Sequence, residues 1–269
     1  MRIALQAGVL VLMFLLAAHV LARMSLYHPM RFPDGYWDLR DRLRVEDVTL
    51  TASDGARLHA WWTPSGEAAV ATLFLHGNAG NVTHRATHIE RLRQAGSTVL
   101  VVDYRGYGRS EGSPSEQGLL RDARAGYDWL RTQGWAPSRI VIHGESLGST
   151  VAVLLAAEVD CAGVVLEAPF PSVQAVAGGI LPLVGPLVAR GFNAGARIPE
   201  IGSPLLIFHG DRDEVIAQRH GRRLFEMAVE PKEFVSVPGA GHNDLVFTAA
   251  DVYVDRLKSF YQRINEGQP

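Results

Sequence analysis

Apolar and polar positions change their pattern once the first segment of the chain is passed. Ile3 to Ala22 form 20 consecutive positions interrupted only by Gln6 and His19, whereas from Val45 short β-rich runs alternate with helical stretches. Several of these runs are apolar on both faces, as parallel strands covered by helices are. The pattern predicts an α/β fold with a mostly parallel eight-stranded sheet, opened by an antiparallel pair. The expected strands are Val45–Thr51, Leu58–Thr63, Val70–His76, Thr98–Asp103, Ile140–Gly144, Gly163–Glu167, Leu205–His209 and Glu233–Val237.

Helices should cover both faces of this sheet. Between the strands that end at Glu167 and begin at Leu205, about 37 residues rich in proline and glycine are too many for an ordinary connection, so a cap insertion is expected over 169–200. The apolar middle of the cap either packs as a helix pair on the sheet edge or forms a lid that accepts acyl chains or touches a bilayer. The expected helices are Thr83–Gln94, Ser115–Thr132, Ser146–Ala157, Gln218–Val229 and Leu245–Ile264.

The first apolar segment is predicted to lie outside the folded domain. Twenty helical residues match a hydrocarbon core of about 30 Å, which favours a membrane anchor over 1–24. A cleaved signal peptide is the alternative, although its apolar region usually runs only about 7 to 15 residues. A connector over 25–44 and one domain over 45–265 follow. We expect a single-pass protein with its domain on the extracytoplasmic side, or else a secreted or periplasmic protein after cleavage.

Composition excludes several classes of function. Lys and Arg number 26 against 28 Asp and Glu, so no basic field exists to bind nucleic acid. The single cysteine, Cys161, cannot form an intramolecular disulfide or supply a thiolate metal site, and it begins an apolar run where we expect it to fill the core. No metal and no cofactor are predicted, and the oligomeric state is left open.

A pentapeptide after one predicted strand indicates nucleophilic chemistry. The strand Ile140–His143 runs into Gly144-Glu145-Ser146-Leu147-Gly148, which a helical stretch follows. Glycines two residues away on each side permit a tight turn from strand to helix that exposes the serine hydroxyl above the sheet. Because a serine hydroxyl is a poor nucleophile at neutral pH, a base and a carboxylate that orients the base are required.

Both partners are predicted downstream of Ser146. Asp213 follows it by 67 residues and His242 follows Asp213 by 29, and each comes after the end of a predicted strand, where open α/β sheets place their ligands. Asp211, expected to cap the turn, and Glu214, expected to begin a helix, compete with Asp213. The histidines that compete with His242 are His76, His143, His209 and His220, of which His143 and His209 are expected to be structural.

Acyl transfer also needs two backbone N–H donors that bind the oxyanion. The N–H of Leu147, directly after the serine and at a helix amino terminus, is the first. The glycine-rich loop His76–Asn81 after the third strand should supply the second, which we assign to Asn78, although a turn without catalytic consequence is the alternative. The loop Asp103–Ser110 either binds phosphate through its arginines or ties the mouth of the site together.

These segments together resemble the α/β-hydrolase superfamily. Residues 76–81, 103–108, 144–148, 209–215 and 241–242 carry the resemblance, which covers roughly residues 25 to 265. With the apolar first segment and Tyr27-His28-Pro29, the chain looks most like the bud-emergence-type, membrane-anchored serine hydrolases. The resemblance implies an α/β-hydrolase fold and a triad of Ser146, Asp213 and His242. Related members include lysophospholipase-like, serine aminopeptidase-like and protein-depalmitoylating enzymes.

The sequence therefore predicts a serine hydrolase that cleaves carboxylic ester or thioester bonds of small, lipid-like or protein-bound acyl substrates. A peptidase or amidase is an alternative, because the same triad cleaves amides. A binding protein on a retired hydrolase scaffold is the alternative from another class, since a fold never guarantees activity.

Overall fold

The computed structural model describes residues 26–180 and 189–266, together with positions 6, 13 and 185. Within this part of the chain, no helix is both long and apolar enough to cross a membrane. The apolar segment Ile3 to Ala22 lies almost entirely outside the described residues, and so does much of the apolar middle of the cap. The anchor, the signal peptide and the membrane orientation accordingly stay predictions.

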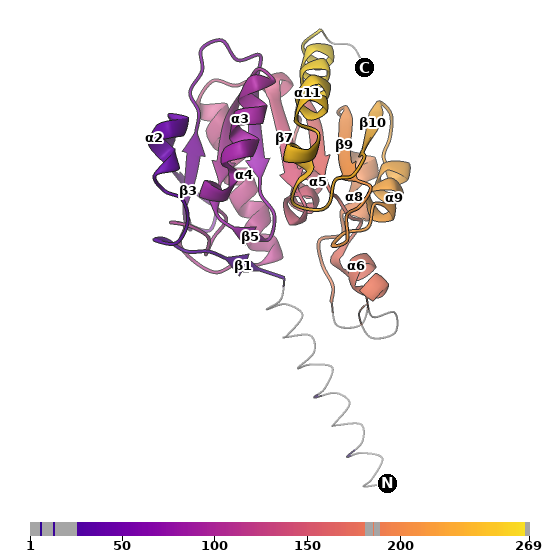
Figure 1. Ribbon diagram of the computed structural model, residues 1–269. Helices are drawn as coiled ribbons and strands as arrows, with labels where there is room; N and C mark the ends of the chain where they lie inside the picture. The colour runs from indigo at the N-terminus through magenta and orange to yellow at the C-terminus, as the bar shows by residue number, and fades with distance from the viewer. Residues whose placement is uncertain (1–5, 7–12, 14–25, 181–184, 186–188, 267–269) are drawn as a thin grey trace.

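An eight-stranded sheet forms the centre of the molecule in the order β10-β9-β8-β7-β4-β6-β3-β2 (Figure 1). The strands from β10 to β6 run parallel, and β3 and β2 continue the sheet as antiparallel strands. All eight predicted strands are present, and no end differs by more than one residue. They are β2 (Glu46–Thr51), β3 (Arg57–Trp62), β4 (Val70–Leu75), β6 (Ser97–Val102), β7 (Ile140–Glu145), β8 (Gly163–Glu167), β9 (Leu205–Gly210) and β10 (Lys232–Val237).

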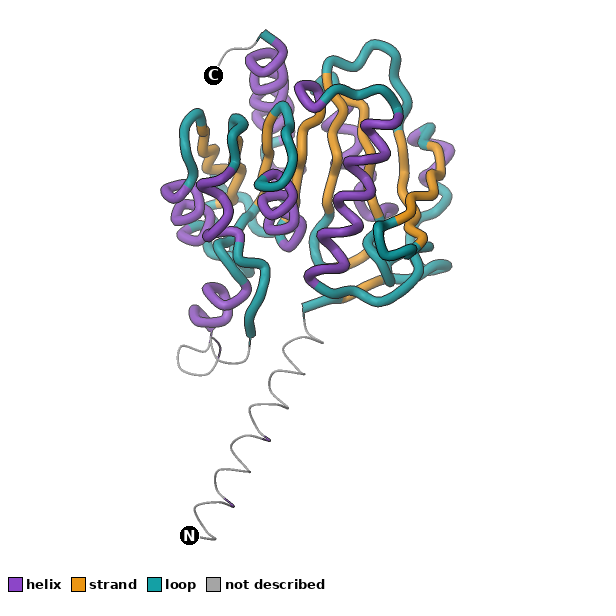
Figure 2. Tube along the Cα trace, turned by 180° about the vertical axis from the view of Figure 1, so that it is seen from behind, coloured by secondary structure: helices purple, strands orange, loops and turns teal. Residues whose placement is uncertain are grey.

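Helices cover both faces of the sheet, and a separate apolar core lies on each face (Figures 1 and 2). One core contains Ile89 of α3 (Ala86–Gln94) and Leu257 of α11 (Ala250–Asn265). The other contains the buried side chains of α4 (Glu116–Thr132), α5 (Leu147–Ala156) and α9 (Arg219–Met227). Short helical segments complete the domain: α2 (Leu39–Leu43), η1 (Val82–Arg85), η2 (Pro137–Arg139) and α10 (Leu245–Thr248).

The structure corrects some details of the predicted elements. The last predicted helix is two helices, because Ala249 between α10 and α11 has non-helical dihedral angles (φ −134°, ψ 51°). The helix expected from Thr83 begins instead as the 3-10 turn η1, capped by the Asn81 side chain. Cys161 precedes β8 and is only partly buried beside Ser203, and burial raises its thiol pKa to about 11. Such a thiol is not an activated nucleophile.

Two features lie together at the carboxyl end of the parallel strands. The segment expected only as a connector forms β1 (His28–Pro29), which pairs in parallel with β5 (Ala79–Gly80) in the loop after β4. The described part of the cap contains α6 (Val173–Ile180), α8 (Ala194–Arg197) and η3 (Ile198–Glu200). Figure 1 shows α6 and β1 at the same end of the sheet.

Candidate active site

Ser146 lies on a strained turn between β7 and α5. Its dihedral angles (φ 51°, ψ −115°) fall in a region that residues with a Cβ rarely adopt, at a cost on the order of 1 to 3 kcal/mol. Two hydrogen bonds hold the turn: the Ser146 N–H donates to the Glu167 carbonyl at 2.8 Å, and the Ser149 N–H donates to the Ser146 carbonyl at 2.9 Å. The turn places the serine side chain at the carboxyl end of the parallel strands.

The tightness of this turn gives a test by mutation. A Cβ at Gly148 would overlap the backbone carbonyl oxygen of Leu75, because α5 begins directly against β4. Gly148→Ala should lower the free energy of unfolding by more than about 3 kcal/mol, measured by urea denaturation. Gly202→Ala is the control, since nothing lies within 4 Å of its added Cβ. Equal urea midpoints for the two variants would contradict this close packing.

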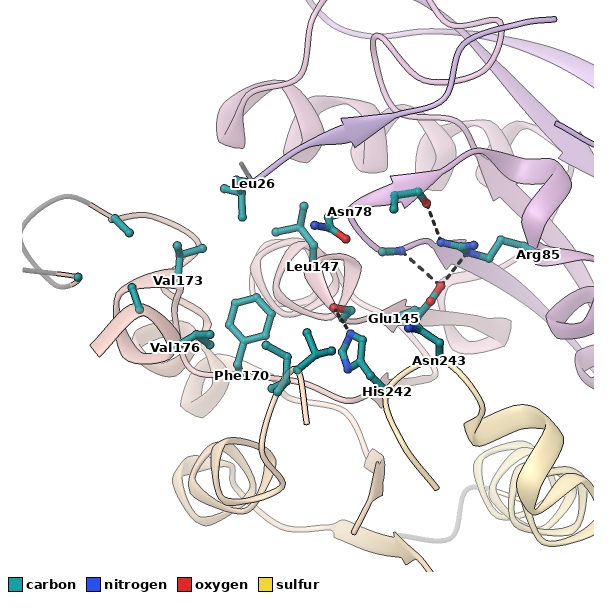
Figure 3. A pocket seen from close by; sticks show the side chains of 18 residues that line it. Leu26, Asn78, Arg85, Glu145, Leu147, Phe170, Val173, Val176, His242 and Asn243 are labelled. Atoms are coloured by element: carbon teal, nitrogen blue, oxygen red, sulfur yellow. Dashed lines mark hydrogen bonds and ion pairs between the residues drawn. The ribbon is translucent and has the colours of Figure 1, made fainter. Parts of the chain in front are cut away.

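The three side chains predicted as a triad form one hydrogen-bonded chain. His242 Nε2 lies 3.0 Å from Ser146 Oγ (Figure 3), and His242 Nδ1 lies 2.7 Å from Asp213 Oδ2. Ser146 and His242 are partly exposed, whereas Asp213 is buried. The arrangement can carry a proton from a serine hydroxyl to an imidazole that a carboxylate orients.

Asp213 is held as a carboxylate. Its Oδ1 accepts hydrogen bonds from the backbone N–H groups of Val215 at 2.9 Å and Ile216 at 2.7 Å. Burial raises the Asp213 pKa, but interactions with His209 and His242 and the backbone bond outweigh burial and hold that pKa well below its usual range. The carboxyl group is therefore ionised at neutral pH, where it can accept a hydrogen bond from the N–H of His242 Nδ1.

The residues that competed with Asp213 and His242 have other contacts. Asp211 Oδ1 accepts the Gly239 N–H at 2.7 Å and so links the Asp213 turn to the loop that carries His242. Glu214 does not begin a helix, because α9 starts five residues later, at Arg219, and Glu214 is exposed. His143 is buried and bonded to Glu167 at 2.6 Å.

The two predicted N–H donors both lie beside Ser146. Asn78 and Leu147 line the same cavity as Ser146 and His242. Leu147 is the first residue of α5, where the helix dipole favours negative charge. His76 supports the Asn78 loop: its Nδ1 donates to the Gly77 carbonyl at 2.7 Å. Burial and the nearby Arg85 guanidinium lower the His76 pKa to about 4, so the ring is neutral.

A cavity of about 700 Å³ opens over Ser146 and is apolar on one side and polar on the other (Figure 3). Leu26 and the cap residues Phe170, Val173 and Val176 form the apolar side. The polar side carries charged groups that the sequence analysis did not single out. They are Arg85 and Glu145, with Asn243 beside them.

Arg85 and Glu145 form an ion pair at the polar side of the cavity. Arg85 Nε lies 2.8 Å from Glu145 Oε2, and Arg85 also donates to the Ala79 carbonyl at 3.0 Å. Burial raises the Glu145 pKa, but the charge of Arg85 and the neighbouring histidines lower it by more. The Glu145 pKa is therefore below its usual value. Among the described residues, no group of three or more histidine, cysteine or acidic side chains is placed to hold a metal ion.

Comparison with known proteins identifies the family. Residues 66–194 match the family described as serine aminopeptidase, S33, a range that contains Ser146 but ends before Asp213. Human alpha/beta hydrolase domain-containing protein 17B is 34% identical over 235 residues, which cover 84% of this chain and 78% of that protein. The chain belongs to the α/β-hydrolase superfamily.

Two further comparisons cover most of the chain. The uncharacterized protein Rv2307c of Mycobacterium tuberculosis is 41% identical over 221 residues, covering 80% of this chain and 78% of that protein. The Pyrococcus furiosus esterase Pf2001 superposes with a TM-score of 0.73 at 23% identity, over 88% of this chain and 98% of that one, a likeness that shows the fold. The matched family and the similarity to the human protein support a hydrolase.

Proposed function

We propose that the protein is a serine hydrolase that cleaves carboxylic esters or thioesters through Ser146, His242 and Asp213. The observation that carries the proposal is the continuous chain of hydrogen bonds from Ser146 Oγ through His242 to Asp213, at 3.0 and 2.7 Å, at the wall of a large cavity. This geometry supplies a nucleophile, a base and a group that orients the base.

In the proposed first step, Ser146 Oγ attacks the carbonyl carbon of the substrate while His242 Nε2 accepts the serine proton. Asp213 holds the opposite N–H of the imidazole and stabilises the imidazolium that forms. The N–H groups of Asn78 and Leu147 bind the oxygen of the tetrahedral intermediate. His242 then donates the proton to the departing alkoxide or thiolate, which leaves the acyl group on Ser146.

In the second step, His242 Nε2 takes a proton from water, and the resulting hydroxide attacks the acyl carbon. The same two N–H groups bind the second oxyanion. When this intermediate breaks down, Ser146 recovers its proton from His242 and the carboxylic acid is released. Every proton passes through His242, so this chain needs no further acid or base.

The two sides of the cavity indicate an amphiphilic substrate. The apolar side formed by Leu26, Phe170 and α6 suits an acyl chain, because each buried CH₂ group contributes about 0.8 kcal/mol. The side that carries Arg85 and Glu145 suits a polar leaving group, since these charges would exclude a second hydrocarbon chain. We therefore propose acyl lipids or acylated proteins as substrates.

The position of Leu26 connects this substrate class with the proposed anchor. Leu26 lines the cavity and follows the apolar segment Ile3 to Ala22 by only four residues. If this segment spans a bilayer, as its length suggests, the cavity lies close to the membrane surface, where acylated substrates concentrate. We propose a single-pass membrane hydrolase on this ground.

The test is hydrolysis by the full-length protein of p-nitrophenyl esters and matching thioesters with chains from acetyl to palmitoyl, with a p-nitroanilide of each acyl group in parallel. We expect turnover that rises with chain length and disappears in Ser146→Ala. An amide-only enzyme would favour the alternative, a peptidase, which the serine aminopeptidase description of the matched family supports. Absence of serine-dependent turnover on every substrate would contradict a hydrolase of either kind.

A substitution in the apolar side of the cavity should change chain-length preference. Val176→Asp places a carboxylate against the proposed acyl site, so KM for a dodecanoyl ester should rise by about tenfold or more, with little change for the acetyl ester. Val252→Asp on α11 is the control, because Val252 is exposed and does not line the cavity. Equal effects on both chain lengths would place the acyl group elsewhere.

A further inference from the structure

The short strand β1 is attached to the loop that carries the proposed oxyanion donor. The His28 N–H donates to the Asn78 carbonyl at 2.9 Å, and the Met30 N–H donates to the Gly80 carbonyl at 3.1 Å. These two bonds fix the backbone on both sides of Ala79 in the register of a parallel ladder. The chain from residue 28 to 30 is thus part of the loop's support, although 47 residues lie between it and Asn78.

A side chain from a third segment holds the same carbonyl. The Tyr107 hydroxyl donates to the Asn78 carbonyl at 2.7 Å, and the Tyr107 ring is fully buried against His76. Burial and the nearby Tyr27 raise the Tyr107 pKa, so the hydroxyl keeps its proton. The Asn78 carbonyl therefore receives two hydrogen bonds, one from β1 and one from the loop after β6.

A further contact, from His76, orients the Asn78 N–H. His76 holds the Gly77 carbonyl, and in a trans peptide the N–H of the next residue points the opposite way. Among the described residues, none accepts a hydrogen bond from that N–H, which leaves it available to a ligand in the cavity. Rotation of the Gly77–Asn78 peptide would turn the donor away from the site, and the two bonds to the Asn78 carbonyl hold the following peptide, so that Asn78 is fixed from both sides.

The strand itself is fastened at its other edge. The Met30 carbonyl accepts the Gly108 N–H at 2.9 Å, and the Arg31 guanidinium donates to the Gly106 carbonyl at 3.2 Å. The segment thus bridges the loop after β4 and the loop after β6. The His28 and Met30 side chains are exposed, and the backbone bonds of both residues attach the strand to this loop.

From these contacts we propose that β1 and Tyr107 position the oxyanion donor, so that the segment directly after the apolar amino-terminal stretch is required for catalytic rate. The inference rests on the proposed function, since it needs an oxyanion to form. His28, through its backbone N–H, and Tyr107 are positioning residues, because they act on the substrate only through Asn78. Loss of one such bond should lower the rate about tenfold, which corresponds to about 1.4 kcal/mol of transition-state stabilisation.

The experiment compares full-length variants that remove one donor each. Tyr107→Phe deletes the hydroxyl and keeps the buried ring, with Tyr36→Phe as control because Tyr36 is exposed outside the cavity. His28→Pro deletes the backbone N–H, and His28→Ala, which retains it, is the reference. For each variant we would measure kcat and KM on the preferred ester, the inhibition constant of an alkylboronic acid that forms a tetrahedral adduct with serine, and Tm.

We expect kcat to fall about tenfold in Tyr107→Phe, and to be about tenfold lower in His28→Pro than in His28→Ala, with KM within twofold. The double variant should approach the roughly 10²-fold loss caused by removing an oxyanion donor. Boronic acid binding should weaken by the same factor as kcat/KM, because both report the tetrahedral state. If Tyr107 and β1 only stabilised the fold, the variants would lower Tm, but boronic acid affinity and kcat/KM would not fall by the same factor.

Two results would overturn the proposal: kcat within twofold of the wild type in Tyr107→Phe, or reduced kcat with unchanged boronic acid affinity. If His28→Pro does not fold, the result for Tyr107→Phe alone tests the proposal, because the phenylalanine ring fills the same space as the tyrosine ring. Failure of the proposed function looks different, because the wild type itself would then show no turnover that depends on Ser146.

Discussion

Replacing Ser146 by alanine is expected to lower kcat by about 10⁴-fold or more on any ester or thioester that the wild type cleaves. In the proposed mechanism the variant loses the atom that forms the acyl-enzyme, while the N–H groups of Asn78 and Leu147 remain to bind the carbonyl oxygen. KM should therefore change little. Steady-state kinetics of the full-length protein measures the loss, and a fluorophosphonate probe that labels the wild type should not label the variant.

Ser259→Ala is the matched control for this experiment. Ser259 lies on α11, where it is exposed and donates a hydrogen bond to the Asp255 carbonyl at 2.9 Å. It should retain wild-type turnover and labelling. If Ser146→Ala kept even a hundredth of the wild-type kcat, another nucleophile would carry the reaction. If neither the wild type nor any variant reacted with the probe, the chain would act as a binding protein.

The sheet could be predicted because each of its strands carries a signal of its own. Runs such as Val70–Leu75 and Ile140–Glu145 are apolar on both faces and end in glycine-rich loops, so their positions are fixed by local sequence. The order Ser146, Asp213, His242 then places three side chains at the same edge of the sheet. In the structure these side chains meet within hydrogen-bonding distance.

The support of the site could not be predicted in this way. Strands β1 and β5 have two residues each, too few for any periodicity, and the bond from His28 to Asn78 joins distant parts of the chain. One signal was present: His28 precedes a proline, which favours an extended backbone. The pairing of Arg85 with Glu145 depends on how η1 and β7 pack, and neither segment reveals that by itself.

Replacing Asp213 by asparagine should lower kcat by about 10³- to 10⁴-fold. The amide removes the charge that stabilises the His242 imidazolium, and its NH₂ group favours the wrong imidazole tautomer, in which Nε2 carries the proton and cannot accept one from Ser146. The shape of the side chain is unchanged, so the fold and KM should be little affected. Kinetics with the preferred ester, together with Tm, measures both effects.

Glu214→Gln is the control that tests whether catalysis needs the Asp213 carboxylate itself or only an acidic side chain in this turn. Glu214 is adjacent to Asp213 and was an alternative candidate for the triad carboxylate in the sequence analysis. It is exposed and forms no ion pair among the described residues. Its amide variant should keep kcat within about twofold, because it leaves the bond between Asp213 and His242 intact. Reversed results, with Glu214→Gln inactive and Asp213→Asn active, would mean that the turn rearranges to present Glu214 to His242 during catalysis.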